Sequence, residues 1–224
     1  MKLNKKLNEI KVVAEKKQNM TVDELRQLIS DITYVFVESC MDAGFDKRQL
    51  TRITTKLRDA GRRSPPWKAF SGRVPGRPQD GADGNRTLRW KLEVGHKFYA
   101  DEVTATLTEV KYYLQLLSMT DAPPLPENTI QTSFSWLPLE HDVVPGFYLD
   151  PIQLIPISLK EIIDDARKIQ SGHLHPLDRG GKHEPQNAFL MLSRSNQLQG
   201  NLTVEELIKL MAEIVKRHAE HHKH

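Results

Sequence analysis

The amino-acid sequence predicts an α+β fold, a mostly helical chain with few short strands that ends in a strand, loop, strand and helix. Three observations predict this class. Apolar residues recur at helical spacing behind capping residues, residues 61–89 are rich in proline, glycine and arginine, and two apolar segments flank a Gly-Gly turn near residue 180. The 224 residues, 38% of them hydrophobic, suffice for a sizeable core.

Charge and cysteine content exclude several classes of protein. The net charge of +3 and the pI near 8.9 are only mildly basic, so affinity for nucleic acid must come from local clusters of Lys and Arg. Cys40 is the only cysteine, which rules out an intrachain disulfide and a cysteine-based zinc cluster. No apolar run approaches the ~20 residues that cross a bilayer, and the first residues lack the apolar stretch of a signal peptide. We expect a soluble, cytoplasmic protein with no membrane contact.

The first sixty residues predict three helices. A basic, frayed helix is expected in the first twenty residues, and Thr21-Val22-Asp23-Glu24 is a capping box for a second helix that Gly44 ends. Asp46 caps a third helix, which Gly61 closes. Two interpretations of the last two helices remain open: a helix-turn-helix that enters the major groove, or ordinary helix packing with a solvated basic face. The basic residues of the third helix are Arg48, Arg52, Lys56 and Arg58.

Residues 61–89 predict a long loop. A loop of this length inside a compact chain is usually either functional or disordered. Guanidinium groups suit both phosphates and the guanine edge, so we favour nucleic-acid binding over a solvated linker. The candidate DNA-binding residues are Arg62, Arg63, Lys68, Arg73, Arg77, Arg86 and Arg89.

The middle of the chain is less regular. Residues 89–98 alternate apolar and polar side chains in part, which predicts a strand. Residues 101–118 predict a core helix with Val103, Leu107 and Val110 on its buried face, and with Glu109 and Lys111 off that face. Residues 121–157 predict irregular connections with one or two short strands. A further capping box, Ser158 to Glu161, starts a helix expected to reach Ile169.

A sequence motif follows this helix. Residues 172–177 predict a short strand, 178–181 a turn, 187–192 an apolar strand and 193–199 a short helix, and a capping box at 203–206 starts the last helix. The order of these elements, the paired glycines Gly180-Gly181 and the spacing of Asn187 and Asn196 resemble the HNH endonuclease family, whose active unit is a ββα-metal finger. The likeness covers roughly residues 170–202.

The resemblance implies a role for three residues. His173 would be the general base, because an imidazole can take a proton from water near neutral pH. Asn187 would brace the loop and hold the strand of His173. Asn196 would bind one divalent ion, Mg²⁺ or in its place Mn²⁺, through a hard neutral amide oxygen.

The motif departs from the family at several positions. Gly172 stands where most members carry a second metal ligand, but it resembles a working variant found in nonspecific nucleases of the same finger class. Leu192 and Ser195 stand where many relatives carry zinc-binding cysteines, so no structural zinc is expected. Gln199 replaces a common lysine. Possible phosphate-binding or supporting residues are His175, Asp178, Arg179, His183 and Arg194.

The whole chain thus predicts a helical DNA-recognition and dimerisation region, residues 1–157, and a nuclease region, residues 158–224. A nuclease of this size with its own recognition region resembles a type II restriction endonuclease, which cleaves double-stranded DNA at specific sites. A homodimer would suit palindromic sites, one finger for each strand. The alternatives are a nonspecific or nicking nuclease and a catalytically silent nucleic-acid-binding protein.

Overall fold

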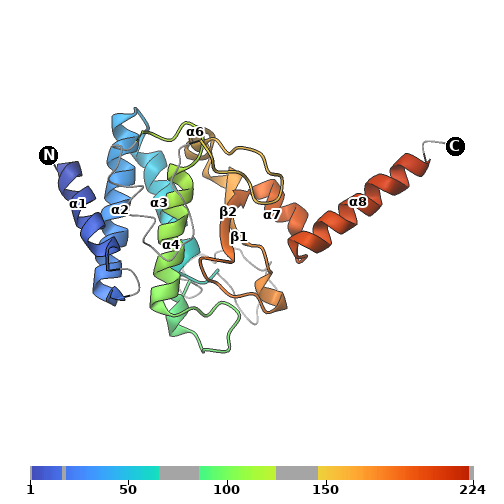
Figure 1. Ribbon diagram of the computed structural model, residues 1–224, viewed down its shortest axis with the longest axis horizontal. Coiled ribbons are helices and arrows are strands. Elements are labelled where there is room, and N and C mark those ends of the chain that lie inside the picture. The colour runs from blue at the N-terminus through green and yellow to red at the C-terminus, as the bar shows by residue number, and fades with distance from the viewer. Residues whose placement is uncertain (1, 17–18, 66–85, 125–145, 222–224) are drawn as a thin grey trace.

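The computed structural model describes residues 2–16, 19–65, 86–124 and 146–221. It confirms the α+β class, because helices dominate the chain and one two-stranded antiparallel sheet accompanies them (Figure 1). Four long helices pack together, the sheet lies against one of them, and the last helix projects away from the body. The four packed helices are α1 (Lys2–Ala14), α2 (Val22–Asp42), α3 (Lys47–Arg62) and α4 (Glu102–Leu117).

The predicted helix starts in the first half of the chain are confirmed. The hydroxyl of Thr21 accepts from the backbone N–H of Glu24, and the Glu24 carboxylate accepts from the N–H of Thr21, so the capping box is complete. The carboxylate of Asp46 accepts from two backbone N–H groups at the start of α3. Gly44 follows α2 with a φ of +91°, the left-handed conformation that glycine adopts most easily.

Gly61 has a different role from the predicted one. The sequence suggests a helix end there, but α3 continues to Arg62 and Gly61 is buried inside it. A Cβ atom added to Gly61 would lie 2.6 Å from the Cβ of Glu109 on α4. The glycine therefore lets α3 and α4 approach closely, and next to it Arg62 forms an ion pair with the buried carboxylate of Glu109.

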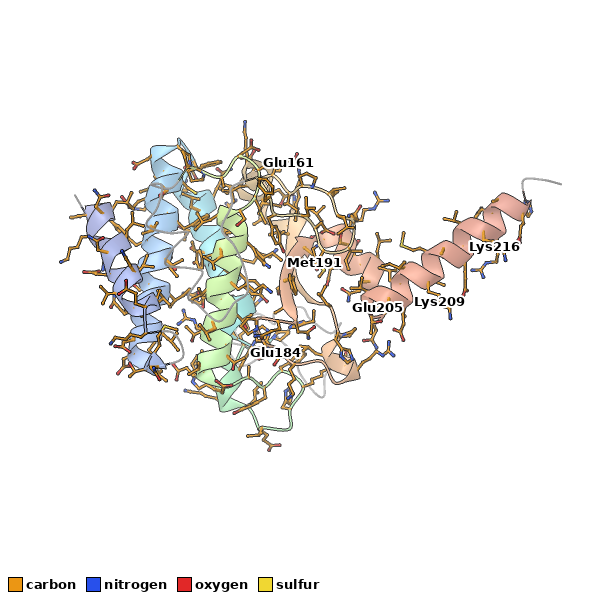
Figure 2. The ribbon with its side chains drawn as sticks, in the orientation of Figure 1. Glu161, Glu184, Met191, Glu205, Lys209 and Lys216 are labelled. Atoms are coloured by element: carbon orange, nitrogen blue, oxygen red, sulfur yellow. The ribbon has the colours of Figure 1, made fainter. Side chains whose placement is uncertain are left out.

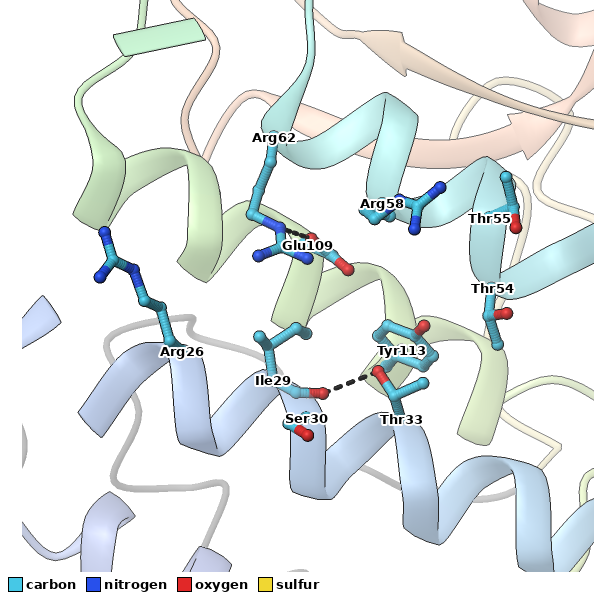
Figure 3. Close-up of a pocket in the computed structure, with 10 residues that line it drawn as sticks. All are labelled: Arg26, Ile29, Ser30, Thr33, Thr54, Thr55, Arg58, Arg62, Glu109 and Tyr113. Atoms are coloured by element: carbon cyan, nitrogen blue, oxygen red, sulfur yellow. Dashed lines mark hydrogen bonds and ion pairs between the residues drawn. The ribbon is translucent and has the colours of Figure 1, made fainter. Parts of the chain in front are cut away.

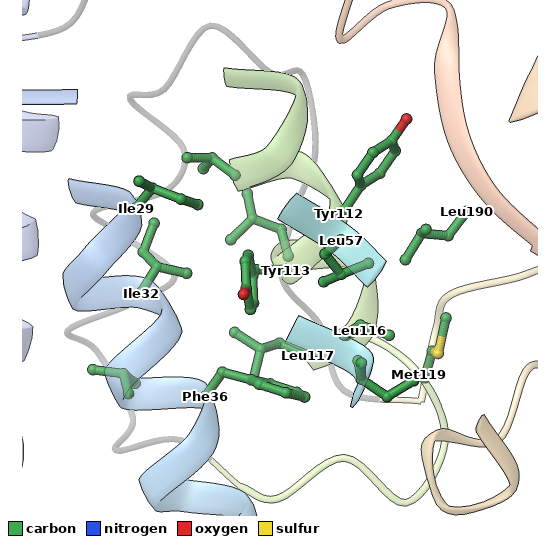
Figure 4. Close-up of a cluster of buried hydrophobic side chains, with 14 of the residues drawn as sticks. Ile29, Ile32, Phe36, Leu57, Tyr112, Tyr113, Leu116, Leu117, Met119 and Leu190 are labelled. Carbon is green, nitrogen blue, oxygen red and sulfur yellow. The ribbon is translucent and has the colours of Figure 1, made fainter. Parts of the chain in front are cut away.

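Helix α4 is the centre of the core, and from Ala105 to Leu117 it is buried on all sides. Val103, predicted on the buried face, is 37% exposed because it lies in the first turn, before the covered part of the helix. The expected polar side is wrong: Glu109 and Lys111 are 1% and 3% exposed. The reason is that α2 and α3 pack against one side of α4 while the sheet covers another. The adjacent Tyr112 and Tyr113 are among the largest fully buried side chains, and Figure 4 shows them within the cluster that joins α2, α4 and the sheet.

The strand predicted at residues 89–98 is wrong. The structure has a 3₁₀ turn, Arg89–Lys91, followed by further turns. The side chain of Arg89 is drawn inward to bond backbone carbonyls, which is incompatible with a regular alternating strand. Just before it, Ser64 donates its backbone N–H to the carbonyl of Thr87 at 2.8 Å, so the two ends of the predicted arginine-rich loop lie together.

The C-terminal elements follow the predicted order with shifted bounds. The helix that begins after Ser158 ends at Asp164 instead of reaching Ile169, and the first strand starts correspondingly earlier. Strands β1 and β2 pair antiparallel, with Gly172 opposite Phe189 and His173 opposite Ala188. The elements are α6 (Leu159–Asp164), 3₁₀ turns Ala166–Lys168 and Leu177–Arg179, β1 (Ile169–His173), β2 (Ala188–Leu192), α7 (Ser193–Gln199) and α8 (Val204–His221).

Helix α8 extends away from the rest of the molecule, with Lys209 and Lys216 along its length (Figure 2). The predicted capping box at its start is present, since Thr203 and Glu206 exchange two hydrogen bonds. None of the described helices combines the length and the apolar character that crossing a membrane requires.

Buried polar side chains fix the sheet to the helical core. Gln115 of α4 accepts from the N–H of Leu190 at 2.9 Å, and the Tyr148 hydroxyl donates to the Leu190 carbonyl at 2.5 Å. The fully buried carboxylate of Asp150 accepts from the N–H of Leu192 and the hydroxyl of Ser195, each at 2.8 Å. An isolated two-stranded hairpin is marginally stable in water, so these bonds position it.

Asp150→Ala is expected to lower the unfolding free energy by about 3 kcal/mol or more, because it leaves several buried donors without their charged acceptor. Urea unfolding measures this loss. The control is Asp42→Ala on the exposed end of α2, expected to change stability by less than about 0.5 kcal/mol. Equal effects from the two variants would contradict the anchoring role of Asp150.

Candidate active site

His173 ends β1 and forms a pair with a second histidine from the loop between the strands. Its Nε2 lies 3.0 Å from Nδ1 of His183, and the two rings meet edge to face. His183 is 1% exposed, and its Nε2 lies 2.7 Å from the carbonyl oxygen of Gly61 on α3. The pair therefore connects the strand to the helical core.

The hydrogen-bond chain assigns the protons on both rings. The Gly61 carbonyl can only accept, so Nε2 of His183 carries a proton. In a neutral His183 the other nitrogen, Nδ1, must then accept, and Nε2 of His173 donates to it. This arrangement leaves Nδ1 of His173 with a lone pair, which is the atom able to take a proton from water.

Burial keeps both histidines neutral. Loss of hydration lowers the pKa of His173 to about 3, with a further contribution from the positive charge of Arg89. The pKa of His183 is also lowered, chiefly by burial and then by Arg89 and His173. Because the unfolded chain protonates these groups near their ordinary pKa of about 6.5, the unfolding free energy should fall as pH drops below that value.

The burial of Arg89 contradicts its place among the predicted DNA contacts. Arg89 is 3% exposed, and its guanidinium donates to the carbonyls of Gly61, Phe98 and Ala60 at 3.0–3.1 Å. It closes the ends of the arginine-rich segment and lies close enough to the histidine pair to affect its protonation. No sequence pattern indicates this burial, because an arginine among prolines and glycines suggests a solvent-exposed position.

Asn187 bridges the loop as the resemblance implies. Its Oδ1 accepts from the N–H of His175 at 2.8 Å, and its Nδ2 donates to the carbonyls of His175 and Lys182. Within the same loop a Cβ added to Gly181 would lie 2.1 Å from the His175 carbonyl oxygen, so only glycine fits. The loop is thereby closed on the residues that follow His173.

Gln199, which stands where a phosphate-binding lysine was noted as common, is instead a buried supporting residue. Its Nε2 lies 2.8 Å from the carbonyl oxygen of His173, and 3.1 Å from each of the carbonyl oxygens of Leu174 and Leu202. The amide thus fixes the backbone of the candidate base from α7. The one feature of the sequence that indicates burial of Gln199 is its position on the inner side of a short predicted helix.

The side chain of Asn196 is held by Gln170 and lies beside Gly172. Its Nδ2 donates to Oε1 of Gln170 at 2.7 Å, which leaves Oδ1 directed toward Gly172. A Cβ on Gly172 would lie 3.0 Å from that oxygen and 2.5 Å from Cε of Met191, so an Asp or His has no room there in this conformation. In the described part of the chain, no group of three or more His, Cys, Asp and Glu residues could hold a metal. The residues fit a hydrated divalent ion bound by one amide oxygen.

The remaining candidates of this region lie on the surface. His175 and Arg194 are exposed, Asp178 pairs with Lys97, and the guanidinium of Arg179 is bound by the carboxylate of Glu206. His183 cannot bind phosphate or metal without losing its present bonds, because both of its ring nitrogens have partners.

The other predicted DNA contacts divide into three groups. Arg62 is paired with Glu109, beside a pocket of about 350 Å³ between α2, α3 and α4 in which Arg26 and Arg58 point apart (Figure 3). Arg63 and Arg86 both lie near the carboxylate of Asp59, at 3.7 and 3.1 Å. The predicted contacts outside the described residues are Lys68, Arg73 and Arg77.

Comparisons with known proteins give little further information. No protein-family model matches the chain, and no curated protein sequence matches it. Among solved structures, a crystal structure of a type II restriction endonuclease is similar over 55% of this chain and 55% of that chain, with 18% identity and a TM-score of 0.47. This similarity is too low to assign an activity.

We expect His173 to be the Nε2-protonated, neutral tautomer at pH 5, because burial and Arg89 disfavour the imidazolium. Long-range ¹⁵N–¹H NMR of the imidazoles identifies the tautomer directly. In His183→Ala the acceptor is lost, so a mixture of the two neutral tautomers is expected. A doubly protonated His173 at pH 5, or the same tautomer in both proteins, would contradict the proton assignment.

Proposed function

We propose that this chain is a metal-dependent DNA endonuclease that hydrolyses phosphodiester bonds at the end of β1. The observation that carries the proposal is the arrangement at two consecutive strand positions. His173 presents an unprotonated ring nitrogen, and Asn196 directs an amide oxygen at the neighbouring Gly172. Gly172 and His173 are the last two residues of β1, so both groups belong to the same end of the strand, where we place the scissile phosphate.

In the proposed reaction, Nδ1 of His173 takes a proton from water. The water oxygen forms a bond to phosphorus, the bond from phosphorus to the 3′-oxygen breaks, and the departing 3′-oxygen takes up a proton from solvent. Mg²⁺ or Mn²⁺ bound by Asn196 would stabilise the negative charge that develops on the phosphate and on the leaving oxygen. A bound phosphate also raises the pKa of the nearby imidazole, which improves His173 as a base relative to the DNA-free chain.

The supporting residues serve this reaction by fixing the base. His183 sets the tautomer, Gln199 bonds the His173 carbonyl, and Asn187 closes the loop behind it. A base held at one position contributes more than a mobile one, because the reacting atoms must meet in a narrow geometry. The same set of bonds gives no catalytic role to Asp178 or Arg179, whose charges are paired with Lys97 and Glu206.

We further propose sequence-specific cleavage of double-stranded DNA, as in type II restriction endonucleases. The support is the motif of residues 170–202 together with a helical region much larger than the finger needs, which is available for recognition. A nonspecific or nicking nuclease and a silent DNA-binding protein are the competing hypotheses. They differ in the products that they form from supercoiled DNA.

Incubation of the chain with supercoiled plasmid and magnesium tests the activity. Discrete linear fragments are expected, none with EDTA in place of magnesium, and His173→Ala should lower the rate by ~10²- to 10⁴-fold, the typical contribution of a general base. His175→Ala, an exposed histidine two residues away, is the matched control and should cleave as the unchanged chain does.

Other products would select a competing hypothesis. A smear indicates a nonspecific nuclease, and nicked circles indicate cleavage of one strand. Unchanged supercoiled plasmid together with retarded migration of a duplex indicates a silent binding protein. Near-normal cleavage by His173→Ala would reject His173 as the base.

We also propose that the chain acts as a homodimer through α8. This helix carries an exposed apolar face, with Ile208, Met211 and Val215 at 61%, 45% and 68% exposure. Exposed apolar faces of this kind mark interaction sites. A second copy is the occupant that the function requires, because a finger with one metal cuts one strand. The sequence-based hypothesis placed dimerisation within residues 1–157. The contact that we propose lies outside that range, on α8.

Ile208→Glu combined with Val215→Glu should convert the dimer to a monomer, because two carboxylates would be buried in the interface. Light scattering after size-exclusion chromatography measures the mass, for which the monomer value is 25.7 kDa. Glu213→Gln, an exposed change on the polar side of α8, is the control and should leave the mass unchanged. A monomeric unchanged chain, or a dimer that survives both substitutions, would reject the α8 interface.

A further inference from the structure

A groove of about 640 Å³ lies between α3, the paired ends of the arginine-rich segment and β1. Three parts of the chain that are distant in sequence therefore meet along one surface. Its described lining includes Arg52, Lys56, Arg63, Arg86, Gln170 and Ser171.

Positive charge dominates this groove. Asp59 is the one carboxylate among its described lining residues, and it is shared by Arg58, Arg63 and Arg86. Arg52 is exposed and makes no ion pair within the described residues. Lys56 donates to the carbonyl of Ala166 at 2.6 Å, which holds its ammonium at the side of the groove next to the β1 region. Several cations with one shared carboxylate form a site for an extended polyanion.

The groove ends at the candidate active site. Gln170 and Ser171 line it, and they directly precede Gly172 and His173 on β1. Gln170 is also the residue that orients the amide of Asn196. A chain of phosphates that occupies the groove therefore continues to the point where the proposed reaction takes place.

The dimensions suit a nucleic-acid strand. With a rise of about 1.5 Å per helical residue, Arg52 on α3 and Arg63 just after its end lie roughly 16 Å apart along the groove. Successive phosphates of one DNA strand advance by about 3.4 Å along the duplex axis, so this length corresponds to about five nucleotides.

We infer that this groove binds the sugar-phosphate backbone of duplex DNA beside the cleaved phosphate, with Arg52 and Arg63 as phosphate contacts. The inference rests on the proposed endonuclease function and extends it to α3. It also assigns the outer basic face of α3 to the backbone, whereas a helix-turn-helix would insert this helix into the major groove and read bases. Phosphate contacts position the duplex and carry no sequence information.

Binding of a fluorescent duplex in EDTA, measured by anisotropy at several salt concentrations, tests the groove. His173→Ala serves as the background in which the DNA stays intact. Arg52→Gln and Arg63→Gln should each weaken binding of any duplex sequence and lower the slope of log K against log salt by about one unit. Arg26→Gln is the matched control, because Arg26 on α2 lines the separate pocket between α2, α3 and α4 and pairs with Asp23 and Glu102. It should leave affinity and slope unchanged.

The outcomes separate this inference from the proposed function. If the unchanged chain cleaves plasmid while Arg52→Gln and Arg63→Gln retain full affinity and slope, the groove is wrong and the nuclease stands. If the two variants lose affinity for only one DNA sequence, the groove reads bases and the backbone site is rejected. It is also rejected if they weaken binding of single-stranded DNA but not of duplex DNA. If the chain binds the duplex without cleaving it, the nuclease function is rejected. The affinities of Arg52→Gln and Arg63→Gln then still test whether the groove binds DNA. Absence of duplex binding rejects both.

Discussion

The carbonyl oxygen of Gly61 is the point on which the candidate site depends. It accepts a hydrogen bond from Nε of Arg89 and another from Nε2 of His183. The first bond closes the base of the arginine-rich segment, and the second fixes the tautomer of His173. This carbonyl is placed by the close packing of α3 on α4, for which residue 61 must lack a side chain. Helix packing in the core therefore determines which nitrogen of His173 can accept a proton.

Polar side chains of α4 anchor the hairpin to the helical core. Lys111 donates to the carbonyl of Pro185, and its ammonium lies 3.4 Å from the centre of the Phe189 ring. Gln115 bonds the backbone of Leu190 one helical turn further along. Buried polar side chains are unfavourable unless they have partners, and here the partners are backbone groups of the hairpin. The contacts with the hairpin cover this side of the helix, so α4 has no solvent-exposed side between Ala105 and Leu117.

Helix α3 presents an apolar face to the core and a basic face to the groove. Leu50, Ile53 and Leu57 are fully buried in the core, while Arg52 and Lys56 line the basic groove. Because the helix is fixed by its apolar face, its cations keep a constant position relative to β1. A DNA strand held along this face would reach His173 without any rearrangement of the core.

The sequence by itself determined the class of the fold, the helix starts at Thr21, Asp46 and Ser158, and the bounds of α7. These features depend on local hydrogen bonds between capping side chains and nearby backbone, which a few consecutive residues specify. The bridging bonds of Asn187 were also implied by the motif, since the loop that it closes is short.

Only the tertiary structure decided the environment of each polar residue. Arg89 in the arginine-rich segment and Glu109 and Lys111 on α4 were all expected to be exposed, and all are buried. Their burial depends on partners far away in the chain, such as Gly61 for Arg89 and Pro185 for Lys111. The pairing of His173 with His183, and of both with Gly61, has the same origin. Periodicity in a sequence reports which residues share a face of one element, but not how many other elements will cover that element.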